Sequence, residues 1–470
     1  MEFVDRNREQ VLLKRALNGE KRSFVVVYGR RRLGKSTLIR RMLGDGDVYY
    51  EASLADRAMQ ISMLARAVGM VYERFERVVY RDWEDVIMAF NDRCAEGSTL
   101  VLDEFPYMVQ RDASLPSVLQ RILDRRVEGG EGLRCNIVVC GSSQRMMMRL
   151  LDGAEPLYGR AEYVLGLKPV SMPYWLDLAD GDARRLVEEY SVWGGVPRYW
   201  GLREEYGSME EAIRGLVLSD LGTLWGEPGR LFMDDVQDVA PYLSIMTALG
   251  SGHLRYMTIA DAVGRKTAEL GKPMNHLMEM AYVRREVPWG EDEQKSKKTL
   301  YRIDDPFMAF YYRFVEPNRS MLAMGRDDVV WQWIERDMPM HVGEVWERLC
   351  QCAVSGRELG GHVWSIAQRW WGKAPVYAEG RKTPIGYEDL EFDVVAEDVA
   401  DHSCLLVGEC KWTAADYADR LLAKLKHKVA LAPFAQNKRI VYVLMLRERP
   451  LSCPDDCLVL LPEDVMSMLY

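Results

Sequence analysis

The chain has 470 residues, 48% of them hydrophobic and 28% charged, a mixture typical of globular proteins and long enough for several domains. The net charge of −9 does not favour nucleic acid as a partner overall, although local patches rather than totals set binding. No apolar run approaches the roughly 20 residues that span a bilayer, so no membrane partner is expected. The charged N-terminus lacks a signal-peptide core, and the cytoplasm is the expected location.

The first motif follows the apolar stretch 24–28, which predicts a buried strand. Its sequence, G-R-R-R-L-G-K-S-T, matches the phosphate-binding loop G-x-x-x-x-G-K-[ST], with a helix-forming stretch after it. Lys35 is expected to reach the β- and γ-phosphates, and the Ser36 hydroxyl to ligate Mg²⁺. The expected nucleotide-binding residues of the loop are Gly29, Arg30, Arg31, Arg32, Leu33, Gly34, Lys35, Ser36 and Thr37.

A second strand, Leu100–Leu102, ends in two carboxylates, Asp103 and Glu104. In open α/β sheets ligands lie at the carboxyl ends of strands, so Asp103 is expected to hold Mg²⁺ and Glu104 to polarise the attacking water. A strand followed by a solvated acidic turn is the alternative, and pairing with the phosphate loop argues against it. The apolar stretch 136–140 then leads to Ser142, a candidate γ-phosphate sensor or helix N-cap.

The middle of the chain predicts helices. Residues 171–235 suggest a helical lid, and residues 236–320 suggest helices followed by two strands joined at a polar turn, an arrangement typical of a winged helix. Thr258 is the expected cap of its first helix. Three lysines at the turn are candidates for phosphate contact or, equally, a solvated tip. They are Lys295, Lys297 and Lys298.

The last third, residues 335–470, predicts a helix, two antiparallel strands, a second helix and a further strand. Glu409 and Lys411 stand two residues apart in one strand and therefore share a face. If Asp393 on the neighbouring strand faces the same way, the carboxylates suit Mg²⁺ or Mn²⁺, and Lys411 can orient the water. Glu347 on the preceding helix would complete the ligands. The alternative is a cross-strand salt bridge, and the order of the elements favours the metal site.

The order of motifs resembles the archaeal-type ATPases of the STAND branch of AAA+ proteins, with a P-loop domain at residues 1–170. The tail resembles their C-terminal domain of unknown function, which is similar to PD-(D/E)XK nucleases. The resemblance therefore implies an α/β protein with a parallel sheet, a helical and winged-helix middle, and a restriction-endonuclease-like tail. The residues that carry it are Phe3–Arg6, the phosphate loop, Leu100–Phe105, Gly141–Ser143, Pro156–Arg160 and Gly194–Pro197.

The resemblance also implies roles for individual residues. Phe3, Val4 and Arg6 would lie near the adenine, and Ser142 would act as the sensor of the third strand. Arg160 would be a sensor or finger arginine, with a structural salt bridge as the equal alternative. Pro197 would pack against the nucleotide. In the tail, Phe392 stands where the nuclease motif usually has proline.

These observations predict a Mg²⁺-dependent ATPase that acts as a nucleotide switch, coupled to a winged helix and a nuclease-like domain that handles DNA. The competing hypothesis is a signalling or scaffold ATPase whose tail binds a protein partner and cleaves nothing. Either protein could assemble as a homo-oligomer. The nine cysteines lack a second close pair with zinc-like spacing, and we interpret them as reduced, mostly buried thiols.

Overall fold

The computed structural model describes residues 5–125, 133–233, 236, 238–376, 384–413 and 417–470, so Phe3 and Val4 lie outside the described residues. The chain forms two compact units. The N-terminal unit comprises Met1–Val170 with two later segments, Val196–Arg198 and Glu227–Val239. The C-terminal unit contains the rest of the chain. The two later segments interrupt the C-terminal unit in sequence, so the chain enters the N-terminal unit three times.

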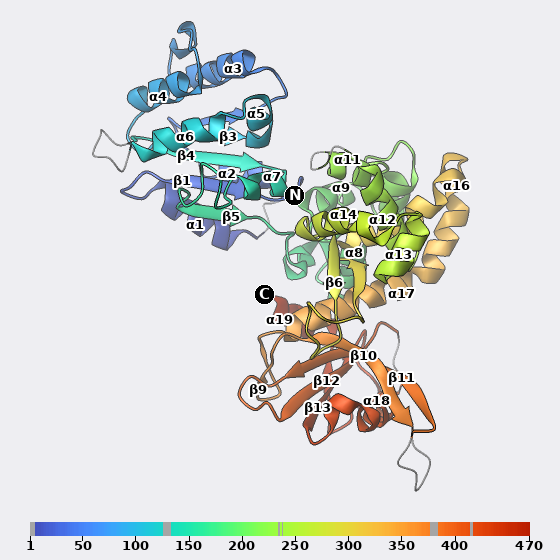
Figure 1. The fold of residues 1–470 in the computed structure, drawn as a ribbon. Helices are drawn as coiled ribbons and strands as arrows, with labels where there is room; N and C mark the ends of the chain where they lie inside the picture. The colour runs from blue at the N-terminus through green and yellow to red at the C-terminus, as the bar shows by residue number, and fades with distance from the viewer. Residues whose placement is uncertain (1–4, 126–132, 234–235, 237, 377–383, 414–416) are drawn as a thin grey trace. The chain divides into compact units, whose positions relative to one another are not determined.

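The N-terminal unit is built on a parallel sheet of five strands in the order β2-β3-β4-β1-β5 (Figure 1). This finding confirms the predicted α/β class and its parallel sheet. The strands are β1 (Phe24–Tyr28), β2 (Val48–Glu51), β3 (Thr99–Asp103), β4 (Asn136–Gly141) and β5 (Tyr163–Gly166). The helices are α1 (Asn7–Leu17), α2 (Lys35–Arg40), α3 (Arg57–Gly69), α4 (Trp83–Arg93), α5 (Phe105–Arg111), α6 (Leu115–Asp124), α7 (Gln144–Arg149) and α11 (Glu227–Met233).

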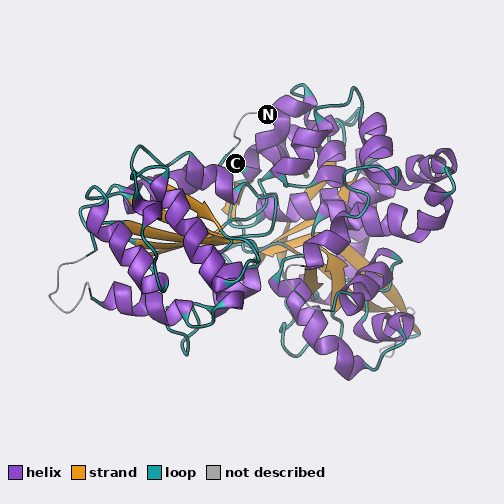
Figure 2. Ribbon diagram, turned by 90° about the horizontal axis from the view of Figure 1, so that it is seen from above, coloured by secondary structure: helices purple, strands orange, loops and turns teal. Residues whose placement is uncertain are grey.

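Both faces of this sheet are covered by helices, because alternate strand residues point to opposite sides. Phe24 and Val26 of β1 pack in one apolar cluster with α3, α4, α5 and α6. Val25 and Val27 pack in a second cluster with α1 and α2. Burial on both sides explains why these strands read as continuous apolar runs. Figure 2 shows the helices around the strands.

The carboxyl ends of β1, β3 and β4 meet at one edge of the sheet, since the three strands are neighbours and parallel. The loop after β1 needs glycine at two places. Gly34 has a φ of 84°, in the left-handed region that glycine adopts freely. A Cβ at Gly29 would lie 2.7 Å from the backbone oxygen of Leu167, so a larger residue there would displace the chain after β5.

The first part of the C-terminal unit is helical, as the sequence predicts. A two-stranded antiparallel hairpin, β6 (Val283–Glu286) and β7 (Leu300–Ile303), follows its helices. The helices before the hairpin are α8 (Ala183–Trp193), α9 (Pro197–Arg203), α10 (Met209–Ile213), α12 (Ala240–Gly250), α13 (Tyr256–Val263) and α14 (Thr267–Glu279), with α9 beginning in the N-terminal unit. After it come α15 (Pro306–Phe310), α16 (Arg319–Ala323) and α17 (Asp327–Val354).

The expected cap of α13 is wrong by three residues. Arg255 is the N-cap, and the Thr258 hydroxyl at the third helical position accepts a hydrogen bond from the Arg255 backbone N–H at 3.3 Å. Thr258 therefore satisfies the chain before the helix rather than the free N–H groups inside its first turn. No described helix combines the length and the apolar character that crossing a membrane requires.

The remainder of the C-terminal unit contains a mixed sheet in the order β10-β11-β12-β13-β14. The first three strands are antiparallel, as predicted for the two at its centre, and β13 and β14 continue in parallel. The strands of this sheet are β10 (Gln368–Val376), β11 (Gly386–Glu397), β12 (Cys404–Lys411), β13 (Arg439–Leu446) and β14 (Leu458–Leu460). Before it, β8 (Glu358–Leu359) and β9 (His362–Val363) form a separate antiparallel pair. The helices of this part are α18 (Ala418–Leu431) and α19 (Pro462–Leu469), and α17 also packs on β11 and β12.

Strand β10 does not follow from the sequence pattern. Gly372 and Pro375 are both unfavourable in strands, which hides the pattern. The structure accommodates them because β10 lies at the edge of the sheet, where a residue without an N–H is tolerated. Trp370 of β10 and Phe392 of β11 pack with residues of α18 in one apolar cluster. This cluster covers the face of the sheet opposite to α17.

Candidate nucleotide site and C-terminal pocket

The phosphate loop places Lys35 at the start of α2, directly after the left-handed Gly34. The Lys35 ammonium donates hydrogen bonds to the backbone oxygens of Gly29 at 2.7 Å and Arg30 at 3.1 Å, so it lies across the loop. Burial lowers the pKa of Lys35, while the charges of Glu104 and Asp103 act in the opposite direction. A buried ammonium at a helix N-terminus is suited to an anionic ligand.

Asp103, at the end of β3, lies beside the loop. Its Oδ2 accepts a hydrogen bond from the Ser36 hydroxyl at 2.8 Å and another from the Tyr49 hydroxyl. Burial alone would raise the pKa of Asp103, but the hydrogen bonds from Tyr49, Cys140 and Ser36 outweigh it and lower the pKa. The carboxylate is therefore ionised next to a hydroxyl oxygen, a set of hard donors that fits Mg²⁺.

Glu104 and Ser142 are brought together from the ends of β3 and β4. The Ser142 hydroxyl lies 3.0 Å and 2.9 Å from the two carboxylate oxygens of Glu104. Glu104 has a φ of 51°, an uncommon conformation for a residue with a side chain, and it precedes α5. The neighbouring Ser143, rather than Ser142, caps α7 by accepting from the Met146 N–H at 3.3 Å. The N-cap at this strand end is therefore Ser143, and the sensor role of Ser142 stays a prediction.

Arginines around the loop have partners within the protein. Arg6 donates to the backbone oxygens of Leu33 at 3.2 Å and Lys168 at 2.7 Å, which ties α1 to the loop. Arg31 donates to the Tyr107 hydroxyl at 2.7 Å, and Arg32 pairs with Glu227 at 2.8 Å.

Four other predicted residues have different surroundings. Arg30 is buried. Thr37 lies in the first turn of α2, which is its position in the site. Arg160 pairs through two nitrogens with Asp124, both at 2.9 Å, which is the salt bridge that the sequence left open. Pro197 begins α9 and belongs to the N-terminal unit together with Val196 and Arg198.

In the C-terminal unit, the predicted carboxylates come from three elements. Glu347 lies on α17, Asp393 on β11 and Glu409 on β12. Asp393 Oδ2 accepts from the Cys410 N–H at 2.8 Å, between Glu409 and Lys411. Glu409 pairs through one oxygen with Lys411 at 2.7 Å and through the other with Lys428 at 2.9 Å. The register and the shared face of Glu409 and Lys411 thus bring these side chains into one neighbourhood.

The electrostatics show how closely the carboxylates interact. Two causes raise the pKa of Glu347 to about 7: burial is the larger, and the charge of Asp393 is the second. Burial and then the charge of Glu409 raise the pKa of Asp393. For Glu409, burial acts in the same raising direction, but Lys411 and Lys428 outweigh it and lower the pKa. Such mutual repulsion is what a divalent cation relieves.

A cavity of about 400 Å³ opens beside this group. Glu347 and Lys411 line it together with two arginines that the sequence analysis missed, Arg302 of β7 and Arg369 of β10. No local spacing signals these arginines, because they reach the cavity from separate strands. Over the described residues, the side chains of Glu347, Asp393 and Glu409 are not among the groups of three whose ligand atoms lie within 4.8 Å of one another.

The parallel sheet, the phosphate loop and the strand-end carboxylates define a P-loop ATPase. Residues 3–200 match the model of an ATPase domain found predominantly in Archaea, and residues 311–422 match a family of archaeal and bacterial proteins of unknown function. The chain is therefore an ATPase whose residues 3–200 are similar to this archaeal type, with an additional C-terminal domain that is similar to the second family.

Two relatives extend the comparison. The chain is 26% identical over 438 residues to the uncharacterized protein MJECL04 of Methanocaldococcus jannaschii, covering 90% of each chain. Its fold is similar to that of the Walker-type ATPase PABY2304 of Pyrococcus abyssi, with a TM-score of 0.50 and 18% identity over 66% of this chain and 96% of that one. The first likeness extends over most of both chains, and the second concerns the fold alone.

Proposed function

We propose that the protein is a Mg²⁺-dependent, ATP-hydrolysing switch whose C-terminal domain is a metal-dependent, nuclease-like module that handles DNA. The observation that carries the C-terminal part of this proposal is the meeting of Glu347, Asp393, Glu409 and Lys411 beside one cavity. They come from a helix and two adjacent antiparallel strands, and a third, parallel strand follows.

In the ATPase site, Lys35 would bind the β- and γ-phosphates, and Ser36 and Asp103 would hold Mg²⁺. When bound, Mg²⁺ supplies positive charge to the phosphates. Glu104 would orient the attacking water and accept its proton, with Ser142 holding the carboxylate in place. Arg6 supports the loop backbone from α1, and Arg160 braces Asp124 of α6, so both would act on the site through the fold.

In the C-terminal pocket, Glu347, Asp393 and Glu409 would hold Mg²⁺ or Mn²⁺, which supplies a nucleophilic hydroxide and charge for the phosphodiester. Lys411 would orient the water. Arg302 and Arg369 would attract the DNA phosphates, which a chain with a net charge of −9 needs locally. Binding would require Glu409 to exchange Lys411 and Lys428 for the cation.

The hairpin β6–β7 supports the coupling part of the proposal, because it is joined to the C-terminal sheet. The backbone N–H of Trp289 donates a hydrogen bond to the backbone oxygen of Arg369 at 2.8 Å. The Trp289 ring packs edge-on against Phe434, with the ring centroids 5.7 Å apart. Arg302 of β7 lines the pocket directly. A movement of the helical region, which we interpret as a lid and a winged helix, would therefore change the charge at the pocket.

A second candidate function rests on the ion pairs of Glu409. Each carboxylate oxygen of Glu409 forms an ion pair with a lysine ammonium group, and Asp393 accepts a hydrogen bond from a backbone N–H. Such pairs describe a structural network, and the domain would then bind a protein partner without cleaving a substrate. The protein would be a signalling or scaffold ATPase.

Calorimetric titration with Mn²⁺ separates the two functions. The Lys35→Ala background weakens nucleotide binding and leaves the C-terminal pocket intact, and the titration is run without nucleotide. Asp393→Ala or Glu409→Ala added to this background should abolish the C-terminal binding event, whereas Asp389→Ala, an exposed carboxylate of the same strand, should preserve it. If the background protein shows no heat that depends on Asp393, and DNA supplied with Mn²⁺ stays intact, the scaffold function stands.

A further inference from the structure

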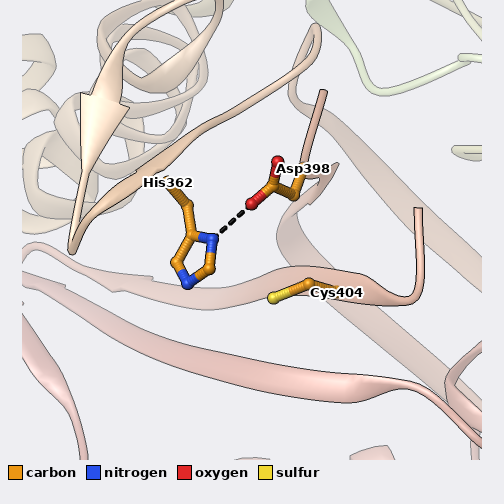
Figure 3. Close-up of side chains that lie close together, drawn as sticks. All are labelled: His362, Asp398 and Cys404. Carbon is orange, nitrogen blue, oxygen red and sulfur yellow. Dashed lines mark hydrogen bonds and ion pairs between the residues drawn. The ribbon is translucent and has the colours of Figure 1, made fainter. Parts of the chain in front are cut away.

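A second group of metal-binding side chains lies at the start of the C-terminal sheet, and no part of the proposed function uses it. His362, Asp398 and Cys404 each offer a ligand atom, and these atoms all lie within 4.8 Å of one another. Figure 3 shows the His362 ring hydrogen-bonded to the Asp398 carboxylate, with the Cys404 thiol pointing toward the same ring. Among the described residues, this is the one group of three such side chains whose ligand atoms lie that close together.

The backbone fixes each of the three donors. His362 begins β9, directly after two glycines whose φ values of 63° and 79° make the tight turn from β8. The Asp398 N–H donates to the Cys404 backbone oxygen at 3.0 Å, closing the loop between β11 and β12. Asp398 Oδ1 accepts from the Ala400 and Asp401 N–H groups at 2.7 Å and 3.2 Å. Its Oδ2 is left to the hydrogen bond with His362 Nδ1.

The chemistry of these donors selects one class of cation. A thiolate is a soft ligand and an imidazole a borderline one, so the set suits Zn²⁺ and does not suit Mg²⁺ or Ca²⁺. The two negative charges of the Asp398 carboxylate and a Cys404 thiolate equal the charge of one divalent ion, which avoids burying an unbalanced charge. His362 is 20% exposed, so water can reach the fourth position of a tetrahedral site.

We propose that His362, Asp398 and Cys404 form a binding site for a thiophilic divalent cation of the Zn²⁺ class. Binding would replace the His362–Asp398 hydrogen bond and require the thiol to lose its proton. Burial raises the pKa of the Cys404 thiol, and the neighbouring Arg439 acts in the opposite direction, so the cation would have to displace the proton.

This site is separate from the carboxylate pocket. Asp398 lies five residues beyond Asp393, and Cys404 five residues before Glu409, which at about 3.3 Å per residue places the sites roughly 16 Å apart along the strands. The soft donors here and the hard donors there would therefore take different metals. The cation would join β9 to the β11–β12 loop and hold that end of the sheet.

Titration of the full-length chain with Co²⁺ tests the proposal, after dialysis against a chelator. Co²⁺ takes the place of Zn²⁺ and gives a thiolate-to-metal absorption band in the near ultraviolet. We expect one equivalent to produce the band and Zn²⁺ to remove it. Cys404→Ser should abolish the band, and His362→Ala should weaken Co²⁺ binding at least tenfold. Zn²⁺ should also raise the melting temperature of the wild type and not of Cys404→Ser.

The matched control is Cys352→Ser, which removes an exposed thiol of α17 and should retain the band. Cys140 near Asp103 and Cys410 near Asp393 could also give a band, and its persistence in Cys404→Ser would overturn the proposal. The absence of a band in the wild type would do the same. If Cys404→Ser does not fold, an unchanged Co²⁺ affinity in His362→Ala and Asp398→Asn is the overturning result.

Discussion

At the scale of single residues, the candidate ATPase site depends on which groups hold its two carboxylates, Asp103 and Glu104. Glu104 and Ser142 lie on different strands, and the serine hydroxyl contacts both carboxylate oxygens. Asp103 is fixed in a similar way by Ser36 and Tyr49. Each carboxylate is thus oriented by a hydroxyl from a neighbouring element, and these contacts determine where the water and the metal would lie.

We predict that Glu104→Gln retains nucleotide binding and lowers the rate of phosphate release by about 10²-fold or more, because general-base catalysis is lost. Ser142→Ala should lower kcat with little change in KM, since it frees the carboxylate without removing it. Ser142→Thr, which keeps the hydroxyl, should restore most of the rate. Lys35→Ala should instead weaken nucleotide binding. Equal hydrolysis by the wild type and Glu104→Gln would exclude the role assigned to Glu104.

At the scale of elements, the long helix α17 is fixed to α8 by a buried histidine. His341 is 1% exposed, and its Nε2 donates to the Ser191 backbone oxygen at 2.8 Å. Burial lowers the pKa of His341 from 6.5 to about 4, despite that hydrogen bond. Since α17 also carries Glu347, the contact helps to set the position of the carboxylate pocket.

The His341 contact predicts a pH dependence of stability. The unfolded chain binds the proton more readily, so the contribution of His341 is complete above pH 6.5 and is lost as the pH falls toward 4. A shift from 6.5 to about 4 corresponds to about 3 kcal/mol at 1.36 kcal/mol per unit. His341→Gln keeps an N–H donor and does not titrate.

We therefore expect the difference in free energy of unfolding between the wild type and His341→Gln to change between pH 6.5 and 4.5, and to be constant from pH 7 to 8. Urea unfolding of the two proteins at each pH measures it. His253→Gln, at an exposed histidine after α12, is the matched control and should leave the pH dependence of the wild type unchanged. Parallel curves for the wild type and His341→Gln at all pH values would show that His341 does not titrate in this window.

At the scale of the whole molecule, the chain passes between its two units several times. A nucleotide switch would need such covalent connections. Val196–Arg198 and Glu227–Val239 belong to the N-terminal unit although the segments around them belong to the C-terminal unit. Arg32 of the phosphate loop pairs with the buried Glu227 at 2.8 Å. A change in the phosphate loop thus has a direct route to a segment that continues into α12.

We predict that residues 190–320 differ in hydrogen exchange between ADP and a non-hydrolysable ATP analogue. A ligand shifts an equilibrium only through contacts that differ between the two states, and Pro197 and the Arg32–Glu227 pair are where such contacts would act. The Lys35→Ala protein is the control and should show no difference between the two nucleotides. Identical protection maps in the wild type would argue against a nucleotide switch.

The sequence by itself determined the α/β class, the phosphate loop, the strand-end carboxylates and the central antiparallel strands of the tail. These features are local: a continuous apolar run, a glycine pattern or a spacing of two residues carries the physical signal. Strand β10 could not be predicted in this way, because its glycine and proline are tolerated only at the edge of a sheet. The local sequence pattern does not reveal that position.

Only the tertiary structure decided which distant side chains meet. It paired Ser142 with Glu104, Arg32 with Glu227 and Glu409 with Lys428, and it assigned Arg160 to Asp124. It also assembled His362, Asp398 and Cys404 from β9, the loop after β11 and the start of β12. Such contacts depend on strand order and register, which are set by packing across the whole sheet, so no short stretch of the chain encodes them.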